Sequence, residues 1–297
     1  MRSTHAVAIV WAMFGVVLAA IVVTYSRLPP HELYNVTGHG LVDGGLSRAV
    51  VYVNFPVGLA AMVLLLAVAD QMSRRQRYAA LGALVLWLPV LSPRVLDESH
   101  LDARWTNAIP VLGVALALAL TVQTRAVRPE RVRGDGARWA LGALLLIVAL
   151  PWIAAELGTD FTGIPVLGQI FQTHELRRQS GVPALHPAVH YGDHHGLEAA
   201  LLLATALLTS RMLGAVRGTR LHAAFGFVAA LVIAYALGNV ANDFWTEQVV
   251  KRGWTRWQVP NVLEPRATWA WLIVLFGGVA LWLLLFRPDT RRESSLR

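Results

Sequence analysis

The chain has 297 residues, of which 56% are hydrophobic and 15% charged, and its formal net charge is +8. Soluble domains average about 45–50% apolar residues, so this composition argues against a soluble globular protein. The absence of cysteine excludes disulfides, thiolate metal ligands and thiol-based catalysis.

The apolar residues form eight blocks, each close to the roughly 20 residues that a helix needs to cross a bilayer. In chain order they are 6–24, 49–69, 78–93, 107–124, 138–156, 196–214, 222–240 and 267–286. The first block is too long for a signal-peptide core and no A-x-A site follows it, so we expect an uncleaved anchor. The blocks predict an all-α, polytopic membrane protein with about eight transmembrane helices. We expect a single helical bundle domain over 1–297, multi-pass in the cell membrane.

The distribution of charge predicts how the helices are oriented. With the N-terminus inside, the inner segments are 1–5, 70–77, 125–137, 215–221 and 287–297, together with Arg138 and Arg211 at helix ends. They hold 16 of the 26 basic residues and 5 of the 18 acidic ones, or +11, which leaves 10 basic and 13 acidic residues, or −3, outside. The positive-inside rule therefore predicts cytoplasmic N- and C-termini. The same rule explains the basic residues as determinants of topology and as contacts for anionic lipid headgroups. We therefore expect membrane lipids and no nucleic acid as partners.

The predicted extracytoplasmic loops are long, at approximately 25–48, 94–106, 157–195 and 241–266, and they hold eight of the ten histidines. Long loops in compact proteins are usually functional or disordered. We therefore expect any activity of the protein to lie on the extracytoplasmic face.

Four histidines stand in the eleven residues HPAVHYGDHHG, at His186, His190, His194 and His195. In a helix, His186 and His190 would share a face about 6 Å apart, a spacing suited to one metal ion, although the glycine and proline in this stretch interrupt a continuous helix. Alternatively, a turn precedes the sixth apolar block, which then begins near His194 with Asp193 as its N-cap. Imidazole and carboxylate ligands suit a divalent Zn, Fe, Mn or Cu ion. Interfacial histidines that only join loops by hydrogen bonds are the alternative, and the sequence favours neither interpretation.

Other polar residues are predicted to line the same outer cavity. Asn239, Asn242 and Asp243 stand at i, i+3 and i+4 at the end of the seventh block, so they share a helix face. Their position predicts that they lie next to the start of the sixth block, where Glu198 should face the cavity rather than lipid. Further candidates are Asn54 in the second block and, in the loop before it, His39 and Asp43.

Three hypotheses of function remain open. The first is a membrane enzyme that uses a metal bound by the four histidines to activate water or oxygen against a lipid-like or otherwise apolar substrate. In it, an acid such as Glu175 or Asp243 moves protons, and Glu198 belongs to the same catalytic site. The second is a protein that binds or transports a metal or a small solute. The third is a scaffold or assembly subunit that docks a partner protein through its outer loops and performs no chemistry. Neither the enzyme class nor the oligomeric state follows from the sequence.

Overall fold

The computed structural model describes residues 3–28, 35–97, 100–124, 134–156, 163–165, 176–178, 185–187 and 196–286. Its α-helices are α1 (Ser3–Arg27), α2 (Ser47–Tyr52), α3 (Gly58–Val68), α4 (Arg74–Trp87), α5 (Ala108–Gln123), α6 (Asp135–Glu156), α8 (Glu198–Ser210), α9 (Thr219–Asp243) and α10 (Trp269–Leu281). Turns of π-helix, η2 (Leu41–Leu46), η3 (Val53–Val57), η9 (Phe244–Val250) and η10 (Trp282–Phe286), adjoin α2, α3, α9 and α10. Short 3₁₀ turns are η4 (Ala69–Gln71), η5 (Leu88–Leu91), η6 (Trp105–Asn107) and η8 (Leu213–Ala215). The strands β1 (Leu176–Arg178) and β2 (Leu185–Pro187) pair antiparallel with Arg177 opposite His186.

The helical segments confirm the predicted all-α class. Because α2, η3 and α3 form one continuous run, the described residues contain eight helical segments, one in each predicted apolar block. Six of them are long and apolar enough to cross a membrane: His5–Arg27, Leu41–Gln71, Trp105–Gln123, Glu198–Ala215, Thr219–Thr246 and Trp269–Phe286. The chain is therefore a multi-span membrane protein, and the small β-hairpin is the described exception to its helical structure.

Two boundaries were predicted wrongly, because both spans extend into segments expected to be loops. The second span begins at Leu41, and the helix that contains α9 continues through η9 to Val250. At Leu41 the reason is packing: Cβ atoms on Gly44 and Gly45 would lie 2.3 and 2.5 Å from backbone carbonyl oxygens of α1. Glycine is a poor helix former, but here it lets η2 lie directly against the backbone of α1, and this contact outweighs its propensity.

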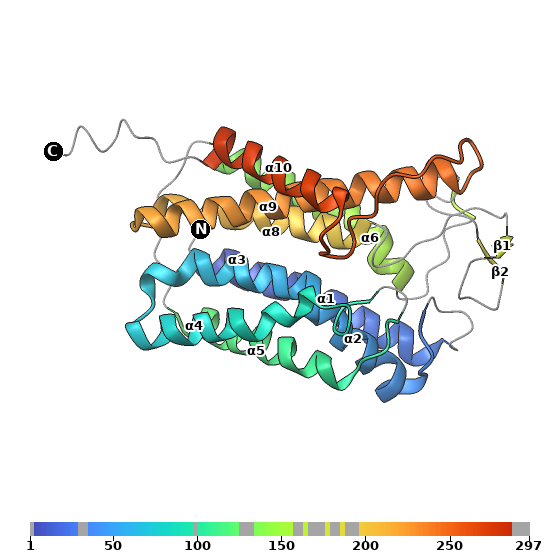
Figure 1. Ribbon diagram of the computed structural model, residues 1–297, viewed down its shortest axis with the longest axis horizontal. Coiled ribbons are helices and arrows are strands. Elements are labelled where there is room, and N and C mark those ends of the chain that lie inside the picture. Colours follow the sequence, from blue (N-terminus) through green and yellow to red (C-terminus); the bar gives the residue numbers. More distant parts are fainter. Residues whose placement is uncertain are drawn as a thin grey trace.

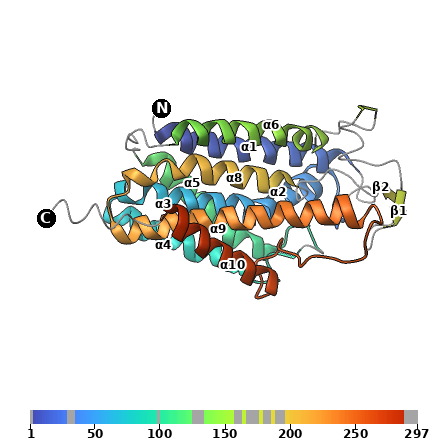
Figure 2. The same cartoon turned by 90° about the horizontal axis from the view of Figure 1, so that it is seen from above.

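The helices run roughly parallel to one long axis, as Figures 1 and 2 show. The spans that contain α3 and α8 are the most enclosed. In each of them 72% of the apolar stretch is buried inside the bundle, whereas the buried share is 22% in the span that contains α10. Helix α4 packs on α5, α6 on α8, and α9 on both α8 and α10. The outward faces carry large exposed apolar side chains, including Leu144, Ile147, Phe276 and Leu284, as expected for helices that contact lipid.

The two ends of the bundle differ in chemistry. One end, here termed the arginine end, carries Arg74, Arg77, Arg211 and Arg220, and it is the end from which α1 starts (Figures 1 and 2). The opposite end, here termed the loop end, carries the β-hairpin. Exposed tryptophans in the segment after η9 and at the start of α10, among them Trp254 and Trp269, are typical of the aromatic belt at a membrane surface.

Candidate functional site

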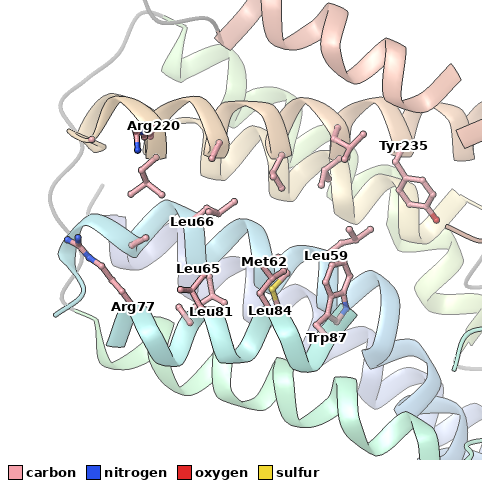
Figure 3. Close-up of a pocket in the computed structure, with 18 of the residues that line it drawn as sticks. Leu59, Met62, Leu65, Leu66, Arg77, Leu81, Leu84, Trp87, Arg220 and Tyr235 are labelled. Atoms are coloured by element: carbon pink, nitrogen blue, oxygen red, sulfur yellow. The ribbon is translucent and has the colours of Figure 1, made fainter. Parts of the chain in front are cut away.

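The described bundle contains an apolar groove of about 1040 Å³ between α3 and α4 on one side and α9 and α10 on the other. This volume is at the upper end of the ~300–1,000 Å³ range of ligand pockets. Figure 3 shows two arginines at one end of the groove, leucines and Met62 along its length, and Trp87 and Tyr235 at the other end. Helix α4 packs on α5 and α9 packs on α8 and α10, while α3 contacts both α4 and α9 and so joins the two walls.

The charged residues that line the arginine end of the groove are Arg77, Arg220 and Asp70. Asp70 Oδ2 accepts hydrogen bonds from the backbone N–H groups of Arg217 and Gly218, which links the end of the second span to the start of α9. Arg77 donates to the carbonyl oxygens of Met72 (3.2 Å) and Asp70 (3.4 Å). Arg220 has no side-chain partner among the described residues and is exposed. Arg74 follows Asp70 by four residues, but the Asp70 carboxylate accepts from the two backbone donors instead.

At its other end, the groove meets a buried polar cluster that we term the Tyr235 cluster: Tyr235, Glu198 and Asn239. The Tyr235 hydroxyl donates to Glu198 Oε1 at 2.7 Å, and Asn239 Nδ2 lies 3.4 Å from the phenol oxygen as donor. The ring of Tyr235 stacks on Trp271, with a centroid distance of 5.4 Å, and meets Phe55 edge-on. All three members are buried, Glu198 to 7% exposure. A carboxyl group in a membrane bundle requires such partners, because an unsatisfied one costs several kcal/mol in hydrocarbon.

A π-helical turn forms the wall of the groove next to Trp87. In η3 the Gly58 N–H donates to Val53 O, five residues back. The carbonyl of Asn54 accepts instead from Trp87 Nε1, at 2.7 Å. Only glycine fits at residue 58, since a Cβ there would lie 2.0 Å from Trp87 Nε1. The irregular turn therefore fixes the indole that closes this part of the groove, in keeping with the frequent use of π turns at functional sites.

The structure brings some of the predicted site residues together and separates others. Glu198 and Asn239 join through Tyr235, so Glu198 lies inside the bundle rather than toward lipid. Asn242 points to a loop instead and donates to Pro260 O, while Asp243 is partly buried. Asn239, Asn242 and Asp243 all lie on α9, but of the three only Asn239 is buried and joins the Tyr235 cluster.

The remaining candidates from the second span and the loop before it do not form one site. Asn54 is fully buried, and neither of its amide atoms has a hydrogen-bond partner among the described residues. His39 and Asp43 are exposed. The nearby loop is held by Asp102, which accepts from the N–H and hydroxyl of Thr37 at 2.9 and 2.7 Å. These contacts hold the segment before the second span against the loop that contains Asp102, as expected for residues that cap the end of the bundle.

Most of the histidine cluster lies outside the described residues: His190, His194, His195 and, in the loop before it, Glu175. His186 lies in β2 rather than in a helix, so it cannot share a helix face with His190. The sixth span starts at Glu198, after Gly196 with its positive φ of 98°, and the predicted N-cap, Asp193, lies outside the described residues. Within the described part of the chain, no three His, Asp or Glu side chains form a group that could hold a metal ion.

Sequence reasoning missed the groove and Tyr235. Leucine, alanine and methionine in a span have the same hydropathy whether they face lipid, a neighbouring helix or a groove. Arg77 and Arg220 were assigned to topology alone, although their positions one turn inside α4 and at the start of α9 were a usable signal. Comparison of the chain with protein-family models, curated proteins and solved structures finds no match.

Proposed function

We propose that this multi-span membrane protein binds one lipid-like amphiphile in the groove between α4 and α9. The observation that carries the proposal is the groove itself: about 1040 Å³, almost entirely apolar along its length, with its charged groups confined to one end. A small polar solute would leave such walls unused, and a water-filled transport path would require polar groups along its length.

The length of the groove matches that of a long hydrocarbon chain. The groove-lining residues Arg220 and Tyr235 of α9 are about 22 Å apart along the helix at 1.5 Å per residue. The hydrocarbon core of a bilayer is about 30 Å thick, so one leaflet supplies about 15 Å. The groove is therefore long enough for a hydrocarbon chain that passes the bilayer midplane. This length supports a lipid-like ligand over a metal ion or a small solute.

The test uses a bulky side chain to fill the groove. Leu84 lines it and is 37% exposed, whereas the next residue on α4, Val85, is 64% exposed and does not line it. We expect Leu84→Trp to displace lipids that co-purify with the protein in mild detergent, and Val85→Trp to retain them, as measured by native mass spectrometry. Equal lipid retention by the two variants, both folded by circular dichroism, would contradict the proposal.

A second candidate function is a metal-dependent enzyme that acts on the same kind of substrate. It is favoured by the position of Glu198, which follows the histidine cluster by three residues and accepts a hydrogen bond from the hydroxyl of the groove-lining Tyr235. In this proposal His186, His190, His194 and His195 bind a Zn, Fe, Mn or Cu ion.

Metal analysis tests this candidate directly. The double variant His190→Ala/His194→Ala should lower the bound metal per protein, because each substitution removes a ligand and weakens the coordination. A matched change of two other histidines, His5→Ala/His100→Ala, should leave it unchanged. If the wild-type protein loaded with each metal in turn retains none, the histidines are loop residues.

A further inference from the structure

We propose that the arginine end of the groove binds the phosphate headgroup of an anionic lipid, taken from the leaflet at that end, with Arg77 and Arg220 as its ligands. The inference rests on the proposed function, because it requires the groove to hold a lipid chain, and adds the headgroup chemistry and the direction of the bound molecule.

The donors at this end point to an oxyanion. Arg77 and Arg220 line the groove from two different helices, α4 and α9, and Figure 3 shows both at the same end. Guanidinium groups bind phosphate oxygens through forked, charge-assisted hydrogen bonds. The 25-residue helix α9 starts here as well, at Thr219, and its N-cap Gly218 has no side chain that satisfies the first N–H groups. Those N–H groups and the helix dipole favour an anion.

Among the described residues no carboxylate pairs with either of these two arginines, although Arg77 also donates to the carbonyl oxygens of Met72 and Asp70. Arg211 is already paired with Asp135, with Nε and Nη2 donating at 3.0 and 2.9 Å. Arg74 donates to the Tyr78 hydroxyl. Asp70, the one carboxylate that lines the groove among the described residues, accepts from two backbone N–H groups. Arg220 has no described side-chain partner, so a ligand oxyanion is the natural counter-ion for it.

Charge also argues against two other occupants. The tail after α10 has the sequence RPDTRRESSLR, with four arginines and two acids, so it has the same sign as the groove end and would be repelled. A second copy of the chain would bring its own arginine-rich end to the same level of the membrane if the two copies were parallel. An anionic lipid complements both the charge of the arginine end and the apolar walls.

The experiment compares two amphiphiles that share one chain, hexadecyl phosphate and hexadecylphosphocholine, titrated into the detergent-solubilised full-length protein. We expect tighter binding of hexadecyl phosphate to the wild type. Arg77→Gln and Arg220→Gln should each weaken it about fivefold, the effect of one arginine near a membrane surface, and should leave hexadecylphosphocholine little changed. The matched controls are Arg75→Gln on α4 and Arg217→Gln before α9, exposed residues that do not line the groove.

The outcomes separate this inference from the proposed function. Equal affinities for the two amphiphiles, or equal losses in the control variants, would overturn the headgroup assignment while the groove still held a chain. Unchanged binding of both amphiphiles in Leu84→Trp would overturn the groove as the binding site. Displacement of hexadecyl phosphate by an equal concentration of inorganic phosphate would identify a free anion as the ligand. A change in oligomeric state in the arginine variants, measured by light scattering, would identify a second copy of the chain as the occupant. Either result would overturn the proposal.

Discussion

The hydrogen bond between Tyr235 and Glu198 joins α9 to α8 inside the bundle and gives the sharpest test of its packing. Tyr235→Phe removes the hydroxyl that donates to Glu198 Oε1 at 2.7 Å but keeps the ring, which stacks on Trp271 and contacts Phe55. The loss in stability should therefore report the hydrogen bond rather than the packing of the ring.

The expected magnitude follows from burial and geometry. Hydrogen bonds between helices in a membrane protein contribute about 0.6 kcal/mol on average and about 1.7 kcal/mol at most. The O···O distance of 2.7 Å lies at the optimum for O–H···O bonds, and both side chains are buried. We therefore expect a coupling energy in the upper part of this range, about 1–1.7 kcal/mol.

A double-mutant cycle measures that coupling. It combines Tyr235→Phe with Glu198→Met, which has a similar size and no carboxylate. Each single variant leaves one buried polar group with one hydrogen bond fewer, which should lower the free energy of unfolding by about 1–3 kcal/mol. The double variant removes both groups, so its loss of stability should be smaller than the sum of the two single losses. The free energy of unfolding is measured by far-ultraviolet circular dichroism in mixed micelles of mild detergent and SDS. The control is Tyr78→Phe, an exposed tyrosine on α4, with an expected change within about 0.5 kcal/mol. Additive single effects, or a loss in Tyr235→Phe no larger than in the control, would refute the contact.

Three further predictions test the packing and orientation of the helices. Arg211→Lys should lower stability by about 1–2 kcal/mol, because lysine cannot reproduce the forked contact with Asp135; a loss below about 0.5 kcal/mol would contradict this. Gly113→Ala should cost about 1–3 kcal/mol, since its Cβ would lie 2.7 Å from a backbone oxygen of α4 and separate α4 from α5; a neutral effect in the same unfolding assay would contradict the close approach. Because the chain has no cysteine, single Arg75→Cys and Arg256→Cys variants can be labelled without background: the first should react with an impermeant maleimide only from the cytoplasmic side and the second only from outside, and the reverse pattern would invert the predicted topology.

The spans were predictable from the sequence because transfer into hydrocarbon depends on composition over about 20 residues, which the chain displays directly. Their ends were not, because these depend on contacts between distant segments. The helix at Leu41 forms although Gly44 and Gly45 disfavour it, since both glycines lie on the backbone of α1. The extension of α9 through Val250 likewise adds polar residues that a hydropathy pattern assigns to a loop.

The candidate site was predictable only where its residues are conspicuous in a membrane. Glu198 and Asn239 stand out because polar groups are rare in spans, and the antiparallel packing of α8 and α9 brings them to the same level of the bundle. Tyr235 was not identified, although it lies between them, because tyrosine in a span is equally compatible with ordinary packing. The groove depends on which helix faces remain apart, and no local pattern encodes the gap between α4 and α9.

The two ends of the groove place opposite demands on a bound amphiphile. If its headgroup lies at Arg77 and Arg220, its chain extends about 22 Å toward Tyr235, and the Tyr235 cluster meets the far end of the chain. A metal bound by the histidine cluster, three residues before Glu198 in sequence, would then act on the chain terminus or on a second molecule that enters from the loop end. If the metal acted on the headgroup instead, the molecule would lie in the opposite direction, and substitution of the two arginines would leave its binding unchanged. The arginine variants therefore decide which end of the lipid any chemistry at the loop end could reach.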